Sequence, residues 1–308
     1  MSNVTGQMFV VTHKRFFLIL SCLFMLGSIA AVAFLGLNLG IDFTGGSIVE
    51  VEYEGIRPPV ADIREALTEA GFGDVLIQPT NERGVIVRAQ SLGEADHAKV
   101  LGALAGKEGK VTEKRFNSIG ATIGSELQQK AVVALILTLL AIILYIAYAF
   151  RKVSEPVSSW KYGLVAIIAL IHNTVIPVGA FAVLGAYFPD YQVDVLFVTA
   201  LLAIFGFSVN DTIVIFDRIR ENLRKNAEAR AHRPFGEVVG SSIAETLTRS
   251  INISVAILLV IASLYFLGSP STKEFSLVLG LGVIFGTYSS ICFAAPLLVA
   301  VEKLQKKA

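Results

Sequence analysis

Residues 195–218 read VLFVTALLAIFGFSVNDTIVIFDR, an apolar run that is interrupted by the polar pair Asn210 and Asp211. An apolar run of about 20 residues is long enough, as a helix, to cross about 30 Å of hydrocarbon. At about 1.5 Å per residue, Asp211 lies about 9 Å deeper in the bilayer than Asp217. The stretch therefore predicts a membrane-spanning helix that carries a carboxylate inside the bilayer.

The same length test identifies further apolar runs, and the composition agrees with them. Of the 308 residues, 54% are hydrophobic and 17% are charged, whereas about a quarter of the residues of a soluble domain are charged. The predicted spans cover approximately residues 16–37, 130–150, 162–186, 195–216, 251–267 and 275–301. This composition excludes disorder, argues against a purely soluble enzyme and predicts a polytopic α-helical membrane protein with six spans.

Charge, cysteine content and motifs exclude several classes of function. The net charge of +1 gives no reason to expect a nucleic-acid partner. Cys22 and Cys292 both fall inside apolar runs, so neither a disulfide framework nor a metal cluster is predicted. The sequence has no phosphate-binding loop and no nucleophile–base pair. We therefore expect no enzyme activity, no metal site and no cofactor.

The distribution of Lys and Arg predicts the orientation of the spans, because short cytoplasmic loops are enriched in these residues. On one side of the predicted membrane lie Lys14, Arg15, Arg151, Lys152, Lys161, Arg218, Arg220, Arg224, Lys225, Arg230, Arg233, Lys303, Lys306 and Lys307. The short loops of the other side contain Lys273 alone. We expect the termini (residues 1–15 and 302–308) and the basic loop 217–249 in the cytoplasm, where the loop attracts anionic lipids. The polar segment 38–129 is expected outside.

The first span has an alternative interpretation. Lys14 and Arg15, the apolar run and the small residues Ala31 and Ala33 also fit a secretory signal with a cleavage site. The run continues to Leu37, which gives it the length of a full span, so a retained anchor is favoured.

The outer segment alternates strand and helix patterns in the order β-α-β-β-α-β. The predicted elements cover residues 47–53, 61–70, 75–78, 84–88, 94–104 and 110–117. This order is that of the ferredoxin-like split unit. The segment contains one histidine, His97, and no metal-ligand spacing, so we interpret it as a binding or levering domain.

Ionisable residues inside the spans are the candidate functional residues, because each costs a few kcal/mol at bilayer depth. Asp211, held between desolvation and a nearby cation, can load and release a proton. Arg249, near the start of the fifth span, could snorkel to the headgroups. Its neighbours Thr246, Ser250 and Asn252 indicate a polar helix face, so an ion pair or relay with Asp211 is favoured. Asp217 is expected at the membrane interface, either paired with Arg220 or in Glu-rich surroundings. His172 is a further candidate relay residue, or a polar contact between helices.

Glycines of the sequence point to packing and to a turn. Gly282 and Gly286 form a small-xxx-small pair, which lets membrane helices approach closely. Gly45 and Gly46 lie just after the first span, where they permit the outer domain to tilt or shape a tight turn.

Three motifs resemble the SecF family of bacterial protein-translocase subunits. They are Gly40–Gly46, which contains Asp42, Gly45 and Gly46; Ser208–Asn222, which contains Asn210, Asp211, Asp217 and Arg218; and Thr246–Ser250, which contains Arg249. The resemblance covers essentially the whole chain. It implies a member of the resistance–nodulation–division superfamily in the bacterial inner membrane, with a periplasmic domain and with Asp211 and Arg249 on a proton path.

The resemblance also implies partners and a mechanism. A SecF-like subunit pairs with SecD, works beside the SecYEG channel in SecA-driven translocation, often with YajC, and uses the proton motive force to promote translocation and release of unfolded preproteins. One departure is visible. The family commonly shows His followed by Asp in the third span, where this chain has His172 and Asn173.

Two other functions remain as alternatives. A small-molecule exporter of the same superfamily usually has two such halves and larger outer domains. A purely structural subunit would hold Asp211 and Arg249 as a static pair. A carboxylate can serve H⁺ or Na⁺, so the sequence leaves the coupled ion open.

Overall fold

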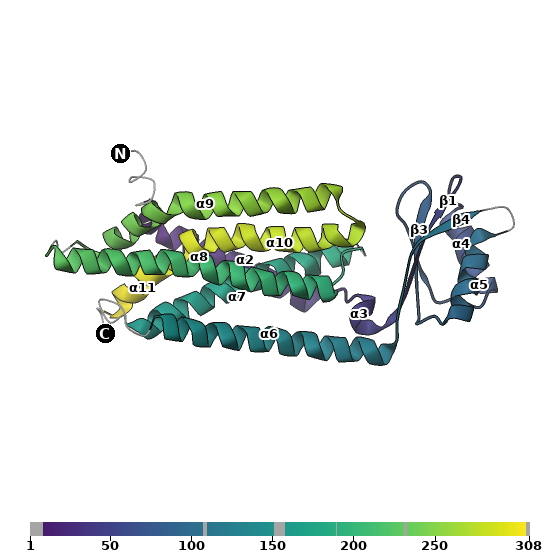
Figure 1. Cartoon of the computed structure of the whole chain (residues 1–308), viewed down its shortest axis with the longest axis horizontal. Helices are drawn as coiled ribbons and strands as arrows, with labels where there is room; N and C mark the ends of the chain where they lie inside the picture. The colour runs from purple at the N-terminus through teal and green to yellow at the C-terminus, as the bar shows by residue number, and fades with distance from the viewer. Residues whose placement is uncertain (1–8, 107–109, 151–157, 189, 231–232, 306–308) are drawn as a thin grey trace. The chain divides into compact units, whose positions relative to one another are not determined.

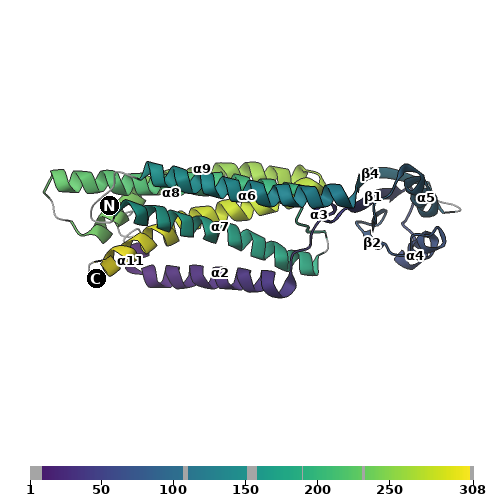
Figure 2. The ribbon, with the colours of Figure 1, turned by 90° about the horizontal axis from the view of Figure 1, so that it is seen from below.

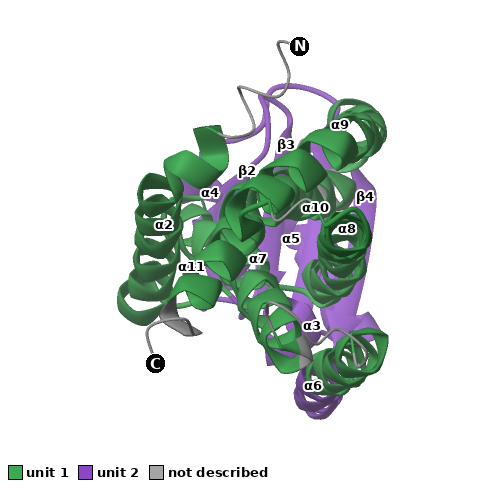
Figure 3. Cartoon of the chain, turned by 90° about the vertical axis from the view of Figure 1, so that its left-hand side faces the viewer, with its two compact units in different colours: residues 1–38, 134–308 green, residues 39–133 purple. Residues whose placement is uncertain are grey.

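A computed structural model describes residues 9–106, 110–150, 158–188, 190–230 and 233–305. The predicted cytoplasmic charges Arg151, Lys152, Lys306 and Lys307 lie outside the described residues, as do residues 1–8. The chain divides into two compact units (Figure 3). Residues 1–38 and 134–308 form the membrane unit, and residues 39–133 form the second unit, against the segment 38–129 expected from the sequence.

Long helices build the membrane unit and run side by side in both views (Figures 1 and 2). They are α2 (Lys14–Leu35), α6 (Ala121–Ala149), α7 (Ser159–Tyr187), α8 (Val195–Glu228), α9 (Phe235–Leu267), α10 (Pro270–Ser289), the π-helix η1 (Ser290–Ala294) and α11 (Ala295–Gln305), of which α6 starts in the second unit. In the described part of the chain, six helical segments are long and apolar enough to span a membrane. The prediction of a multi-pass membrane protein is therefore confirmed.

The spans divide into central and peripheral helices. In the most apolar window of α7 and of α8, 56% of the residues are buried within the chain, whereas α2 and α6 bury 6%. Helix α10 packs against α7, α8 and α9 (Figure 3). Asp194 is the N-cap of α8, and its carboxylate accepts a hydrogen bond from the Phe197 amide at 2.7 Å. The central helices therefore surround a protein core, while α2 and α6 present apolar side chains outward.

Glycines of α10 make its contact with α8 close. A Cβ atom on Gly282 would overlap the side chain of Ile204, and one on Gly286 would lie 3.3 Å from the ring of Phe207. The small-residue pair predicted from the sequence is thus confirmed as a packing feature.

The second unit is a four-stranded antiparallel sheet with two helices on one face (Figure 1). Its elements are α3 (Ile41–Thr44), β1 (Gly46–Tyr53), α4 (Val60–Glu69), β2 (Leu76–Pro79), β3 (Gly84–Ala89), α5 (Glu94–Ala105) and β4 (Val111–Ile119). The strand order β2-β3-β1-β4 and the helix positions are those of the ferredoxin-like unit. Val49 and Val51 of β1 pack with Leu67 of α4 and Val100 of α5. The predicted fold class is confirmed.

The two consecutive glycines shape a tight turn in this unit. Gly45 has φ +73°, and a Cβ on it would lie 2.7 Å from Cα of Ala121, the first residue of α6. A Cβ on Gly124, one turn further along α6, would lie 2.7 Å from the Gly45 amide nitrogen. Glycine is therefore required both for the backbone conformation and for the close approach of α6. Tilting about these glycines stays a prediction.

Substitutions of two glycines, Gly282 and Gly206, test the close contact of α10 with α8. We expect Gly282→Ala to lower the free energy of unfolding by about 1–3 kcal/mol, because the new methyl group overpacks the contact with Ile204. The control is Gly206→Ala in α8, where a Cβ meets nothing within 4 Å. Thermal unfolding of the purified chain in detergent measures both variants. Equal melting temperatures for the two would contradict the close α8–α10 contact.

Candidate intramembrane carboxylate site

The carboxylate of Asp211 is bound by hydroxyl groups from two other elements. Asp211 lies on α8 and is 7% exposed. The Ser250 hydroxyl of α9 donates to its Oδ1 at 2.5 Å, and the Ser290 hydroxyl, at the start of the π-helix, donates to its Oδ2. Helices α8 and α9 and the π-helix therefore meet at one buried acidic group.

The π-helix places Ser290 in this site. A π-turn is a single widened turn inside an α-helix and is frequent at functional sites. The Ser290 hydroxyl also reaches the Thr287 carbonyl at 3.0 Å, and the Thr287 hydroxyl lies 2.6 Å from that of Ser254 on α9. Small hydroxyl side chains thus line the contact of α9 with the last span around Asp211.

A second buried polar group adjoins the same face of α8. His172 and Asn173 of α7 are both 0% exposed. The Asn173 amide donates to the Ser208 hydroxyl at 2.6 Å, and Ser208 lies one turn before Asp211 on α8. Nδ1 of His172 lies 2.9 Å from Oδ1 of Asn173, so this nitrogen is the donor.

The other side of His172 is apolar. Its ring stacks on Phe293 of the π-helix with centroids 4.8 Å apart. Nε2 of His172 is buried and has no hydrogen-bond partner in the described part of the chain. The structure brings His172 to the same π-helix that carries Ser290, and it gives Nε2 no direct contact with Asp211.

The expected ion pair between Asp211 and Arg249 is not formed, and this prediction is corrected. Arg249 is exposed, and no ion pair or hydrogen bond joins it to Asp211 among the described residues. Adjacent residues of an α-helix project about 100° apart, since one turn takes 3.6 residues. Because Ser250 faces Asp211, the neighbouring Arg249 points away from Asp211, at nearly the same depth along α9. On α8, Asn210, the neighbour of Asp211, is likewise exposed.

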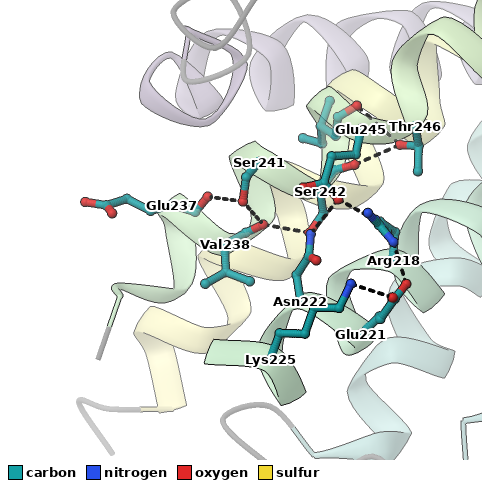
Figure 4. A network of polar contacts seen from close by, with 11 residues as sticks. Arg218, Glu221, Asn222, Lys225, Glu237, Val238, Ser241, Ser242, Glu245 and Thr246 are labelled. Carbon is teal, nitrogen blue, oxygen red and sulfur yellow. Dashed lines mark hydrogen bonds and ion pairs between the residues drawn. The ribbon is translucent and has the colours of Figure 1, made fainter. Parts of the chain in front are cut away.

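The acidic residue at the end of the motif has the role expected for it. Asp217 is exposed and pairs with Arg220 at 2.7 Å, so the predicted pair is confirmed. Arg218 forms ion pairs with Glu221, at 2.6 Å, and with Glu245 of α9 (Figure 4). This part of the motif is a surface network rather than an extension of the buried site.

The first motif lies in the ferredoxin-like unit. Asp42 is in the first turn of the short helix α3 and is half-buried, and Gly45 and Gly46 follow at the start of β1. These residues shape the turn described above. In this structure they form the turn against which the start of α6 packs.

The structure adds residues that the sequence did not single out. Ser290 lies in an apolar run, and no sequence pattern distinguishes it. Ser250 belongs to the third motif, in which the charge of Arg249 is the more prominent signal. In the described part of the chain, no group of three or more His, Cys, Asp or Glu side chains is arranged for a metal ion.

The arrangement suits proton uptake chemically. A hydroxyl group can donate a hydrogen bond to a carboxylate and can accept one from a carboxylic acid. Asp211 can therefore be satisfied in both protonation states without breaking an ion pair. A buried carboxylate with hydroxyl partners alone is less strongly fixed in its charged form than one paired with arginine.

These features define a class: a multi-pass membrane protein with a ferredoxin-like unit after its first span and a buried carboxylate in its fourth. Residues 99–304 match the family described as protein export membrane protein SecD/SecF, C-terminal, and residues 30–55 match the SecD/SecF GG motif. The chain belongs to the SecD/SecF family.

Relatives and solved structures agree with this assignment. A protein translocase subunit SecF from Thermobaculum terrenum is 40% identical, over 95% of this chain and 93% of its own. That of Vibrio alginolyticus is 36% identical, over 85% and 79%. A crystal structure of SecDF from Thermus, a translocon-associated membrane protein, is similar with a TM-score of 0.80 and 32% identity. The alignment covers 96% of this chain and 38% of that chain. A super-membrane-facing form of SecDF aligns with a TM-score of 0.64.

The buried amide contact yields a stability prediction. We expect Ser208→Ala to lower the free energy of unfolding by about 1–3 kcal/mol, because it leaves the Asn173 amide buried without its acceptor. The matched control is Ser263→Ala, since the Ser263 hydroxyl is exposed and bonds only to the Leu259 carbonyl of its own helix. Thermal unfolding in detergent compares them. A Ser263→Ala loss as large as that of Ser208→Ala would contradict the network.

Proposed function

We propose that this chain acts as the SecF-type accessory subunit of a bacterial Sec protein translocase. It lies in the inner membrane with both termini in the cytoplasm and the ferredoxin-like unit in the periplasm. With SecD, it uses the proton motive force to promote translocation and release of preproteins delivered through SecYEG by SecA, with YajC as a further partner. The observation that carries the proton part is the buried Asp211 with its two serine donors.

Proton movement at Asp211 changes the contacts of three elements at once. When the carboxylate is charged, both serine hydroxyls donate to it. When it is protonated, its own O–H needs an acceptor, so one serine must turn its hydroxyl. The bonds that join α8, α9 and the π-helix therefore depend on the proton. This dependence supports a cycle in which proton uptake and release shift the last span against α8.

The driving force is modest for each proton. One charge that crosses 100 mV provides about 2.3 kcal/mol. The ferredoxin-like unit is the part that would carry this work to the preprotein, and the Gly45–Gly46 turn is the site about which it would tilt.

The exposed polar residues of the spans support a partner subunit. Asn210 on α8 and Arg249 and Asn252 on α9 are all exposed, and Arg249 lies level with the buried Asp211. A guanidinium group at that depth is costly against lipid tails. A polar face of SecD on α8 and α9 would satisfy it, and the proton path would then include Arg249 at the subunit interface rather than inside this chain.

Asn173 makes Asp211 the main proton carrier of this chain. An amide cannot take up a proton at neutral pH. Asn173 therefore holds the His172 ring by a hydrogen bond and carries no proton itself. His172 remains a candidate relay residue through its buried Nε2.

The Asp211 proposal predicts a specific loss of export. Asp211→Asn keeps the size of the side chain and removes its charge, so we expect proton-dependent export to fall to the rate without this subunit. The matched control is Asp217→Asn on the same helix, since Asp217 is exposed and its pair with Arg220 is worth about 0–1 kcal/mol. Pulse-chase of precursor processing in cells measures both.

The same export assay distinguishes the proton-driven subunit from a static structural subunit and from a Na⁺-coupled one. Wild-type export by Asp211→Asn would refute proton work at this residue and favour a static structural subunit. Export that follows an imposed Na⁺ gradient, with protons equilibrated by an ionophore, would replace H⁺ by Na⁺ as the coupled ion.

The partner proposal predicts where a cross-link forms. A photo-reactive residue in place of Asn252 should capture a SecD subunit in native membranes, because this exposed amide lies about one turn from Arg249 on α9. The control position is Leu137 of α6, which is 59% exposed on an apolar helix. Capture of SecD from position 137 and not from 252 would contradict the assigned face.

A further inference from the structure

Two side chains of α8 converge on one carboxylate of α9. Nε of Arg218 donates to Glu245, and Nδ2 of Asn222 donates to Glu245 Oε2 at 2.9 Å (Figure 4). The same Asn222 amide reaches the Ser242 hydroxyl at 3.0 Å. We call Arg218, Asn222 and Glu245 the staple.

The staple is braced on its α8 side. Arg218 also pairs with Glu221 at 2.6 Å, and Glu221 in turn pairs with Lys225 at 2.7 Å. Arg218 and Asn222 are one turn apart, so both lie on the face of α8 that meets α9. On the α9 side, the Thr246 and Ser242 hydroxyls bond to carbonyls of their own helix. Glu245 therefore supplies the carboxylate that joins the two helices here.

The staple and the Asp211 site lie on one antiparallel helix pair. Helix α9 returns beside α8 after a short connection. From Asp211 to Arg218, α8 advances by about 10 Å, and from Glu245 to Ser250, α9 runs about 8 Å in the opposite sense. The Asp211–Ser250 bond and the Arg218–Glu245 pair are therefore neighbouring polar contacts between the same two helices.

If α8 slid along α9, the Asp211–Ser250 hydrogen bond and the Arg218–Glu245 ion pair would break together. A shift of one turn is about 5.4 Å, which is more than either hydrogen bond tolerates. Apolar contacts between helices are not directional, whereas a carboxylate that accepts from two donors on α8 fixes one register. The ion pairs Asp217–Arg220 and Arg224–Glu228 join residues of α8 to each other and therefore fix no register.

We infer that Arg218, Asn222 and Glu245 are positioning residues that set the axial register of α8 against α9 and so hold the Ser250 hydroxyl at the Asp211 carboxylate. The register itself is independent of what Asp211 does. Its consequence for export rests on the proposed function.

Disulfide formation measures the register directly. In a full-length chain with Cys22→Ala and Cys292→Ala, the pair Asp211→Cys and Ser250→Cys is oxidised in membranes, and linked peptides are quantified by mass spectrometry. We expect Glu245→Ala to slow cross-linking about fivefold, the factor that a partly exposed network is worth. The control Arg220→Ala removes an ion pair inside α8 and should leave the rate unchanged.

A charge exchange distinguishes positioning from damage. Arg218→Glu combined with Glu245→Arg restores an ion pair across the helices, so we expect cross-linking to recover beyond that of Glu245→Ala. A Glu245→Ala rate equal to that of the native staple would overturn the inference. So would equal slowing by Arg220→Ala.

Export assays on chains with native Asp211 and Ser250 test the consequence. Glu245→Ala should reduce proton-dependent export, and the charge exchange should restore part of it. If cross-linking falls while export is unchanged, the claimed dependence of export on the Asp211–Ser250 contact is wrong. If Asp211→Asn leaves export unchanged, the proposed function fails, and the cross-linking result still decides the register.

Discussion

A carboxylate inside a bilayer must obtain its hydrogen-bond donors from the protein, and here Asp211 obtains them from Ser250 and Ser290. The cost of a buried acidic group without donors is several kcal/mol. The close packing of α10 at Gly282, the π-turn at Ser290 and the α8–α9 hairpin all bring those donors to α8. The central spans therefore meet at one buried acidic group, whose carboxylate is satisfied by a serine hydroxyl of α9 and one of the π-helix.

The three sequence motifs have three different positions in this arrangement. The Gly45–Gly46 turn lets the start of α6 approach the ferredoxin-like unit. The motif on α8 supplies the buried carboxylate and, two turns further on, the arginine that pairs with Glu245. The motif on α9 supplies Ser250 to the site and Arg249 to the exposed face. The first motif thus serves packing, and the other two supply the two sides of the Asp211–Ser250 hydrogen bond.

Local sequence predicted the elements well because each depends on its own residues. The spans follow from run length, the strand and helix order of the ferredoxin-like unit from periodicity, and the Asp217–Arg220 pair from helical spacing. The partners of Asp211 depend instead on how helices rotate against one another. The comparable depth of Arg249 and its polar neighbours predict an ion pair with Asp211, but the adjacent Ser250 faces the site. Ser290 reaches Asp211 through a π-turn, which no pattern in the sequence marks.

In the proposed function, Asp211 takes up and releases a proton among its serine donors. Infrared difference spectroscopy of the purified chain with SecD, recorded between low and high pH, observes the C=O stretch of a protonated carboxylic acid directly. If Asp211 takes up a proton, a carboxylic acid band disappears as the pH rises and is absent in Asp211→Asn. A difference spectrum identical in the native protein and in Asp211→Asn would contradict it.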